Sequence, residues 1–378
     1  MKTVLKNFEY FVNGMSVKDK SLTIEGDTIA AVHSDQDKDQ NARIIDLEGN
    51  YLVPGFVDLQ VNGGEEVFFS NDITEEAIGQ IYDNHLKFGT TCILPTLIST
   101  SLSNILKAIE AVRAYMQYKQ GVAGLHIEGP FLNLFKKGAH NTKYIRKPGD
   151  EELRAILDAG EGIIKMITIA PEMFSDEQIK MMVSRNIRIS AGHSNASSQL
   201  AKVYFSKGIN CVTHLFNAMS QFNSREPGLV GATLDSDVYA GIIVDGVHCD
   251  YTSVRIACKL KKGKLFLVSD STFIGVKSLE MDGIKFIYSG EGFVNSQGNL
   301  AGSNITISDA VRKCVNNVGI SLADASKMAS EIPLEVIGLS GSRGKIEPGY
   351  KADIAILSKD DLSVNAVIAS GEYLALND

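Results

Sequence analysis

Four side chains of this 378-residue chain are of the types that bind a divalent metal ion and use it in hydrolysis: Glu128, His193, His214 and Asp270. Imidazole and carboxylate ligands suit Zn²⁺ or a similar first-row ion, and three of them leave a position open for water. Water activated in this way needs a carboxylate that takes and returns its proton, and Asp270 fits that role. Each residue alone could be a buried hydrogen-bonding group, so the prediction depends on whether the fold brings the four together.

Eight apolar, β-branched runs recur through the middle of the chain, each of a length typical of a strand. Helical patterns separate most of them, such as the spacing of Ile78, Ile81, Tyr82 and Leu86. Strand–helix alternation implies a parallel sheet, and eight units favour an α/β fold, the (β/α)8 TIM-type barrel, over a doubly wound sheet. The runs span residues 51–62, 90–97, 122–128, 164–170, 187–193, 211–216, 240–245 and 265–270.

The candidate residues lie towards the ends of four different runs. Glu128 ends the third run, His193 the fifth and Asp270 the eighth, and His214 lies in the sixth. The carboxyl ends of barrel strands surround the active site in enzymes of this fold. A barrel would therefore gather the four residues on one edge, which favours a metal-dependent hydrolase.

The two ends of the chain show short strand patterns instead of the strand–helix alternation of the middle. Residues 21–25 and 28–33 form short strand patterns around a turn at Gly26-Asp27, and residues 352–357 and 366–368 do the same. Because neither end can bury a sheet face alone, we expect a small β-sandwich domain formed by both termini, residues 1–50 plus 341–378. Residues 51–340 would form the catalytic barrel, with a hairpin inserted at residues 285–299.

Composition excludes several classes of protein. The chain carries 37 Lys and Arg against 45 Asp and Glu, a net charge of −8. Such a chain is a poor binder of nucleic acid or of an anionic membrane. The five cysteines are widely spaced, so neither a disulfide framework nor a zinc ribbon is expected. The sequence has no signal-peptide core and no apolar run of about 20 residues, so we expect a cytoplasmic protein.

The remaining chemistry-bearing residues give weaker signals. His33 and His85 are expected to be structural, and His126 to form hydrogen bonds in the core, whereas His140 lies in a loop where it can face a ligand. There is no G-x-S-x-G elbow, no phosphate-binding G-x-x-x-x-G-K-[ST] loop and no G-x-G-x-x-G after a strand.

Taken together, the motifs resemble those of the amidohydrolase superfamily and, within it, of the N-acetylglucosamine-6-phosphate deacetylases. They occur in the family's order over most of the chain. The matching segments are residues 54–58 (PGFVD), 58–63 (DLQVNG), 126–133 (HIEGPFLN), 137–141 (KGAHN), 191–194 (AGHS), 213–219 (THLFNAM), 225–228 (REPG), 268–270 (VSD) and 344–353 (GKIEPGYKAD).

The resemblance implies a reaction and a set of roles. Water activated by a metal would hydrolyse the acetamide of N-acetyl-D-glucosamine 6-phosphate to D-glucosamine 6-phosphate and acetate, a step of amino-sugar catabolism. The implied roles are metal binding by Glu128, His193 and His214; general base and acid catalysis by Asp270; oxyanion stabilisation and carbonyl contact by His140; and sugar-phosphate binding by His248, Asn217, the backbone N–H of Ala218, and Arg225 from a neighbouring subunit. Arg225 therefore implies a homodimer.

One departure from the superfamily concerns the first strand. Most members carry H-x-H there and hold a second metal, whereas this chain has Gln60 and Asn62. Amides are weak ligands for such ions, so these vestigial positions imply one divalent ion per subunit, with zinc favoured and iron, cobalt, manganese or nickel as alternatives. Two other functions stay open: hydrolysis of another N-acyl sugar phosphate such as N-acetylgalactosamine 6-phosphate, and a non-catalytic sugar-phosphate sensor.

Overall fold

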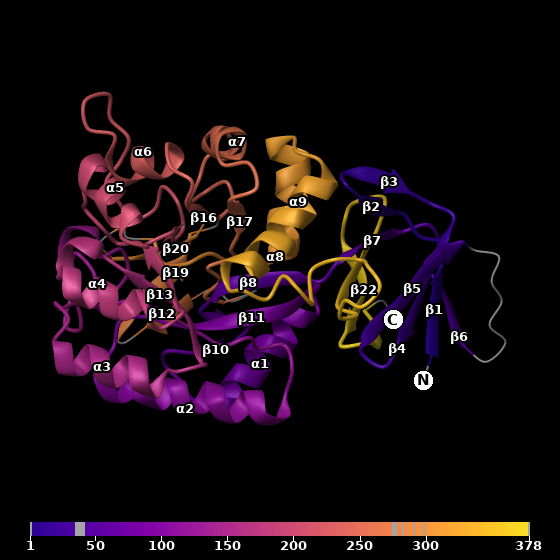
Figure 1. Ribbon diagram of the computed structural model, residues 1–378, viewed down its shortest axis with the longest axis horizontal. Coiled ribbons are helices and arrows are strands. Elements are labelled where there is room, and N and C mark those ends of the chain that lie inside the picture. Colours follow the sequence, from indigo (N-terminus) through magenta and orange to yellow (C-terminus); the bar gives the residue numbers. More distant parts are fainter. Residues whose placement is uncertain are drawn as a thin grey trace.

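Eight parallel strands form the barrel of the computed structural model, which describes residues 2–34, 42–273, 278–281, 283–289, 292–296, 298 and 300–376. Neighbouring strands pair in chain order, which confirms the predicted (β/α)8 barrel (Figure 1). The strands are β8 (Phe56–Val61), β11 (Thr90–Leu97), β12 (Leu125–Glu128), β13 (Ile164–Ile169), β14 (Arg188–Ala191), β15 (Cys211–Val212), β16 (Tyr239–Ile242) and β17 (Leu265–Leu267).

The barrel closes between β8 and the segment that follows β17. Val61 and Ser271 form a parallel bridge, and the backbone N–H of Asp270 donates to the carbonyl of Gln60 at 3.0 Å. Below this contact the buried carboxylate of Asp58 accepts the N–H of Ser269 at 3.2 Å. Closure therefore places Gln60 and Asp270 side by side.

Helices surround the barrel, and most of them bury one face. In α1 (Glu75–Leu86) the predicted stripe is buried at Ile78, Ile81 and Tyr82, and Thr74 caps the first turn by accepting the N–H of Ala77. The other helices are α2 (Leu102–Tyr118), α3 (Asp150–Ala159), α4 (Asp176–Val183), α5 (Ser198–Ser206), α6 (Gly228–Leu234), α7 (Tyr251–Leu260), α8 (Ile307–Lys313), α9 (Leu322–Ala329) and α10 (Glu331–Val336), with short turns η1 (Leu134–Lys136), η2 (Pro171–Met173) and η3 (Cys314–Val318).

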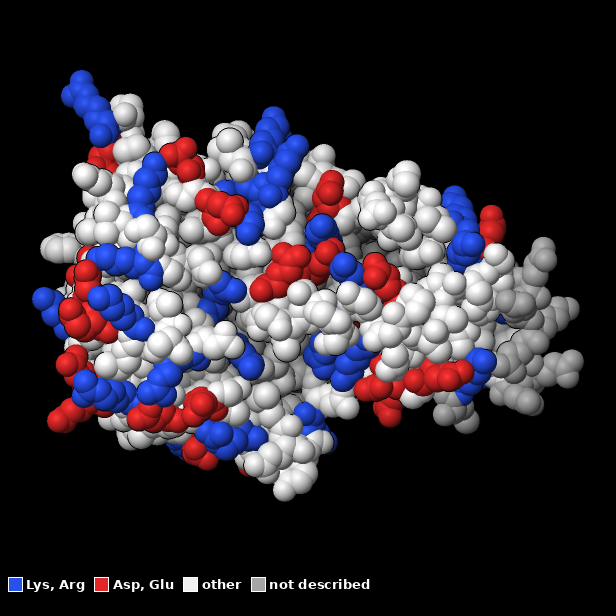
Figure 2. Space-filling view, viewed as in Figure 1, with Lys and Arg blue, Asp and Glu red and all other residues white. Residues whose placement is uncertain are grey.

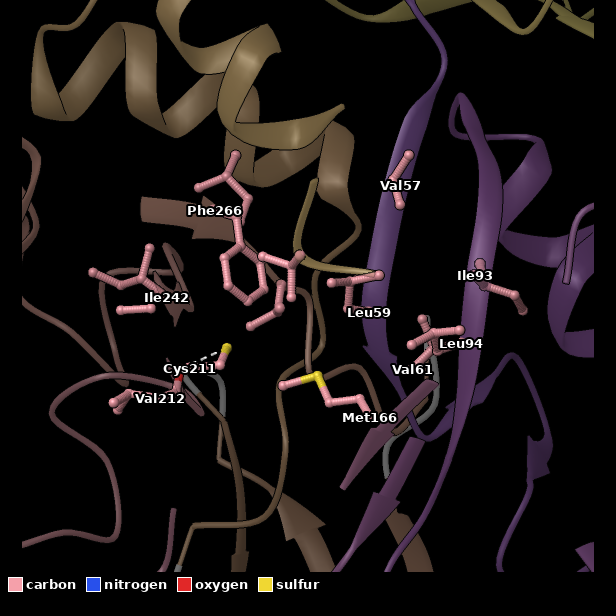
Figure 3. Close-up of a cluster of buried hydrophobic side chains, with 14 of the residues drawn as sticks. Val57, Leu59, Val61, Ile93, Leu94, Met166, Cys211, Val212, Ile242 and Phe266 are labelled. Carbon is pink, nitrogen blue, oxygen red and sulfur yellow. Dashed lines mark hydrogen bonds between the residues drawn. The ribbon is translucent and has the colours of Figure 1, made fainter. Parts of the chain in front are cut away.

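The barrel interior is filled by apolar side chains. Leu59 of β8, Met166 of β13 and Phe266 of β17 converge on a common centre (Figure 3), and each is at most 2% exposed. Close packing of this kind makes the barrel a rigid support rather than a pore. The interior also holds a few hydrogen-bonded polar side chains, such as His126 and Thr168.

A separate pair of sheets comes from both ends of the chain, as predicted. One sheet has the order β5 (Thr28–Ser34), β4 (Lys20–Glu25), β1 (Lys2–Lys6), β6 (Arg43–Asp46). The other has the order β23 (Glu372–Ala375), β22 (Val364–Ala369), β21 (Ile354–Leu357), β7 (Tyr51–Pro54). Leu5, Ile24, Leu52, Ile354 and Ile368 belong to one buried cluster contributed by both sheets. The domain boundaries at residues 50/51 and 340/341 stay a prediction.

The expected first barrel strand, residues 51–62, is wrong in its extent. Tyr51–Pro54 pair with β21 in the terminal sheet, and only Phe56–Val61 pair with β11 in the barrel. Gly55 separates the two strands where the backbone passes Thr91 so closely that a Cβ would lie 2.3 Å from its Oγ1. The apolar run is continuous in sequence because residues 51–54 are packed in the terminal sheet and residues 56–61 in the barrel sheet, and both sheets favour apolar side chains.

Smaller strands complete the described chain. β19 (Ile284–Tyr288) pairs antiparallel with β20 (Phe293–Asn295), as the predicted hairpin requires, and with β18 (Ser278–Met281). Gly290 and Asn299 of that prediction lie outside the described residues. The remaining short strands are β2 (Tyr10–Val12), β3 (Met15–Val17), β9 (Gly63–Gly64) and β10 (Val67–Phe68).

The surface carries charges of both signs. Figure 2 shows Lys and Arg intermingled with Asp and Glu over the barrel. Attraction of an anionic ligand would therefore come from residues placed within a site. Among the described residues, no helix is both long and apolar enough to cross a lipid bilayer.

Candidate active site

A cavity of about 220 Å³ opens at the carboxyl ends of the barrel strands. It gathers residues from strand-end loops that are far apart in sequence. Its lining includes Asn62, Phe68, Ile98, Glu128, Gly138, Ala139, His140, His193, His214, Asn217, Ala218, His248, Asp270, Thr272, Leu300, Ala301 and Gly302. Among the described residues, the fold therefore unites the four candidate side chains with His140, His248, Asn217 and Ala218, while Arg225 is not part of this lining.

Glu128, His193 and His214 form a tight triangle of ligand atoms. Glu128 Oε1 lies 3.2 Å from His193 Nε2 and 3.0 Å from His214 Nε2, and the two Nε2 atoms are 3.1 Å apart. All three residues are buried. Burial would raise the pKa of Glu128, but hydrogen bonds and charge from His193 and His214 outweigh it and hold that pKa well below its usual range.

The orientation of His193 favours a cation in this triangle. Its Nδ1–H donates to the carbonyl of Lys136 at 2.8 Å, so Nε2 presents a lone pair. When the ring is neutral, this lone pair faces a carboxylate oxygen and a second imidazole nitrogen, an arrangement that suits a cation bound by all three groups. The donor set of two imidazoles and one carboxylate therefore fits a divalent first-row ion.

His140 also lies close to the triangle, since it brings one ligand atom within 4.8 Å of those of Glu128 and His193. Its Nδ1 accepts the backbone N–H of Ser99 at 3.3 Å and lies 2.8 Å from Ser99 Oγ. Burial, then the charge of His193, lowers the pKa of His140 to about 3, so the ring is neutral and its proton is on Nε2. That tautomer makes His140 a hydrogen-bond donor rather than a third imidazole ligand.

Asp270 is held by the two amides of the first strand. Asn62 Nδ2 donates to Asp270 Oδ1 at 2.7 Å, and Gln60 Nε2 donates to the same oxygen at 3.1 Å and to Glu128 Oε1 at 3.2 Å. Burial, followed by the charge of Glu128, raises the pKa of Asp270 to about 7. The amide nitrogens point at carboxylates, and an amide, which can bind a metal only through its oxygen, is a weak ligand for a first-row ion.

His248 also lines the cavity. Its Nδ1 is 2.6 Å from Asp245 Oδ2, and its Nε2 is 2.9 Å from the carbonyl of Ala301. Burial opposes a charge on the ring, but the hydrogen bond and charge of Asp245 outweigh it and raise the pKa of His248. With two acceptors beside its two nitrogens, His248 is suited to carry positive charge towards an anionic ligand.

Arg225 is exposed on the loop before α6 and forms no hydrogen bond or ion pair with the described residues. Glu226, its neighbour, instead accepts the N–H groups of Ser198 at 2.7 Å and Gly228 at 3.1 Å. The simple alternative of a local Arg225–Glu226 ion pair is therefore not formed, and the guanidinium is available to another molecule.

Sequence reasoning assigned the other histidines correctly. His126 lies 2.8 Å from Thr168 Oγ1, His85 Nε2 lies 2.9 Å from the carbonyl of Gly63, and both are buried. It overlooked Ser99, which follows the second barrel strand, and Glu172, which follows the fourth. Both lie at the carboxyl ends of strands, so the rule that found the other residues could have found them.

Comparison with known proteins places the chain among characterised relatives. A model of the amidohydrolase family matches residues 51–374. The chain is 38% identical over 97% of its length, and 98% of the relative's, to N-acetylglucosamine-6-phosphate deacetylase of Haemophilus influenzae. It is 36% identical to N-acetylgalactosamine-6-phosphate deacetylase of a Shewanella strain, over 87% of this chain and 84% of that protein. The crystal structure of N-acetylglucosamine-6-phosphate deacetylase from Pasteurella multocida superposes with a TM-score of 0.96 at 36% identity, over 99% of this chain and 100% of that one.

Proposed function

The chain belongs to the amidohydrolase family, and we propose that it hydrolyses N-acetyl-D-glucosamine 6-phosphate to D-glucosamine 6-phosphate and acetate. The observation that carries this proposal is the convergence of the Glu128–His193–His214 triangle, Asp270 and His140 on one cavity. These groups supply a cation site, a proton carrier and a hydrogen-bond donor. An amide is a poor electrophile, so its hydrolysis needs all three.

One divalent ion per subunit, with zinc favoured, would be held by Glu128, His193 and His214. When bound, such an ion lowers the pKa of water and polarises a carbonyl. Lys136 fixes the tautomer of His193 through its carbonyl, at 2.8 Å from Nδ1. Gln60 ties the ligand Glu128 to the proton carrier Asp270, which fixes their relative orientation.

Asp270 and His140 would be the two side chains that act directly on the reacting groups. Asp270 takes the proton from the attacking water and returns it to the leaving amine. Because Oδ1 is occupied by Asn62 and Gln60, Oδ2 is the oxygen that exchanges the proton. His140 donates from Nε2 to the oxygen of the acetyl group, where negative charge develops as the carbonyl carbon becomes tetrahedral.

The phosphate of the substrate would bind in the same cavity. Asn217 and the backbone N–H of Ala218 would provide donors there, His248 would provide positive charge, and Arg225 of a neighbouring subunit would complete the set in a homodimer. A guanidinium binds phosphate through two parallel hydrogen bonds, which suits Arg225 for this task.

We place the enzyme in the cytoplasm, where its free cysteines, four of them buried, stay reduced.

A second candidate substrate is N-acetylgalactosamine 6-phosphate, because a relative that is 36% identical bears that activity in its name. The two sugars differ only in the orientation of one hydroxyl group. The retained triangle and Asp270 disfavour the third possibility, a non-catalytic sensor, because a sensor has no use for a proton carrier.

The test is release of acetate from both sugar phosphates by protein of measured metal content. We expect acetate from N-acetylglucosamine 6-phosphate, a smaller kcat/KM for the galactose epimer, and loss of activity with a chelator that is restored by added metal. Turnover of neither substrate by metal-loaded protein would refute the proposal, and a larger kcat/KM for the epimer would select the second candidate.

A further inference from the structure

Glu172 connects three strand-end segments without lining the cavity. It lies in η2, directly after the fourth barrel strand, and its side chain accepts three hydrogen bonds. Asn133 Nδ2 and the N–H of Asn195 donate to Oε1 at 2.9 and 2.7 Å, and Ser194 Oγ donates to Oε2 at 2.7 Å. One carboxylate therefore joins the loop after β12 to the segment after β14.

Both segments held by Glu172 act on His193. The N–H of Asn133 donates to the carbonyl of His193 at 3.0 Å. Asn133 Oδ1 also accepts the N–H of Phe135 at 3.0 Å and so begins η1, the turn whose Lys136 carbonyl accepts His193 Nδ1–H. The other segment begins with Ser194, the residue next to His193. The main chain and the ring of His193 are thus both set by groups that Glu172 ties together.

His193 needs such support because its backbone is strained. Its φ is +49°, in the left-handed region that a residue with a Cβ rarely adopts. Conformations of this kind persist only where the surroundings impose them. Glu172 forms no ion pair with Lys or Arg of the described part of the chain, so its three neutral donors account for its position.

We propose that Glu172 is a positioning residue that directs Nε2 of His193 towards the metal site. The inference rests on the metal site of the proposed function, although it does not depend on the identity of the substrate. Hydrogen-bond partners outside a ligand set orient the ligands, and their removal commonly weakens metal affinity by about 10–100-fold.

The test compares Glu172→Ala and Glu172→Gln with Glu161→Gln. Glu161 is an exposed glutamate in the turn before β13, the strand that Glu172 follows, so its variant is a matched control. The readouts are the Kd of Zn²⁺ by competition with a chromogenic chelator, the visible spectrum of the Co²⁺ form, and the urea unfolding of metal-free protein. We expect Glu172→Ala to raise the Kd by about 10–100-fold and to change the Co²⁺ spectrum.

Glu172→Gln retains the oxygen that accepts from Asn133 and Asn195, so it should recover most of the affinity, while Glu161→Gln should match the wild type. A wild-type Kd and Co²⁺ spectrum for Glu172→Ala would overturn the proposal, as would a loss of affinity fully matched by a loss of stability of the metal-free protein. If Glu172→Ala does not fold, Asn133→Ala replaces it with the same expected and contrary results. Normal metal binding without acetate release would refute the proposed function and leave this inference intact.

Discussion

The side-chain amide of Asn62 donates to Oδ1 of Asp270 at 2.7 Å, and this contact fixes one of the two carboxylate oxygens. Gln60 adds a second amide donor to the same atom at 3.1 Å. The two positions that bind a metal in H-x-H members of the superfamily are therefore occupied by hydrogen-bond donors. They orient the carboxylate by donation rather than by coordination, and they leave its other oxygen for the proposed proton transfer.

Replacement of Asp270 by Asn should abolish turnover without removing the metal. Asparagine has the same shape but cannot accept and return a proton, so we expect kcat to fall by about 10²–10⁴-fold. The measurements are the rate of acetate release at saturating substrate and the metal content by elemental analysis. Asp237→Asn, at a carboxylate that is 86% exposed, is the control. Full activity in Asp270→Asn would contradict the assignment of the base.

The metal content of the wild-type protein should be one divalent ion per chain. Glu128 is the only carboxylate in the triangle, and its Oε1 lies within 3.2 Å of both imidazole nitrogens. Glu128→Gln should therefore lose most of the bound metal and the activity with it. Elemental analysis after dialysis against metal-free buffer measures both quantities. Two ions per chain would show that Gln60 and Asn62 do not exclude a second metal.

His140→Ala should lower kcat by about 10²–10³-fold, the usual effect of removing one donor from an oxyanion site. Its Nδ1 accepts from Ser99, so its Nε2–H is the group that is lost. We expect metal content to be unchanged, because that tautomer offers no lone pair to a cation. A steady-state comparison of kcat and KM, together with elemental analysis, checks this. Loss of the metal in His140→Ala would instead make His140 a ligand.

The part of the site that could be predicted from the sequence consists mainly of residues at the ends of barrel strands. Glu128, His193, His214 and Asp270 were placed together because parallel strands bring their carboxyl ends to one edge. Ser99 and Glu172 occupy equivalent places but were overlooked, since a serine and a glutamate resemble ordinary polar residues when no neighbour is known. Their importance depends on hydrogen bonds across distant segments.

Two other features could not be predicted from sequence patterns, because they depend on distances between atoms in the folded chain. The apolar run over residues 51–62 hides a change of sheet at Gly55, because both parts of the run are buried. The choice between His140 and His214 as the second imidazole ligand depends on which nitrogen of His140 carries the proton. That tautomer is set by the backbone N–H of Ser99, 41 residues away in the chain.

The stability of the terminal sheets should depend on pH through Glu9. Burial would raise the pKa of Glu9, but hydrogen bonds from Lys359, Ser16 and Lys18 outweigh it and lower the pKa to about 2. The carboxylate therefore stabilises the folded state above its ordinary value of 4.5, and this contribution is lost as pH falls from 4.5 towards 2.

We expect Glu9→Gln to lower the free energy of unfolding by about 1 kcal/mol at neutral pH, since the partner lysines are partly exposed and screened. Urea unfolding followed by circular dichroism at pH 7 and at pH 3 measures the difference between variant and wild type, which should shrink at the lower pH. A difference that is equal at both pH values would show that the charge of the Glu9 carboxylate is not the source of the stabilisation.

Arg225 provides the sharpest test of the homodimer, because its exposed guanidinium lies outside the cavity lining of its own chain. Arg225→Ala should raise KM for the phosphorylated substrate by at least about tenfold, the loss expected for a charge-assisted hydrogen bond, with metal content unchanged.

If Arg225 acts across the interface, a hybrid dimer of Arg225→Ala and Asp270→Asn chains contains one complete site. In that site the Arg225→Ala chain supplies Asp270 and the Asp270→Asn chain supplies Arg225. Differently tagged chains, co-expressed and purified through both tags, should then regain about half of the wild-type activity per dimer at the wild-type KM. If Arg225 acts within its own chain, neither site is complete, and purified hybrids would show the raised KM or no activity.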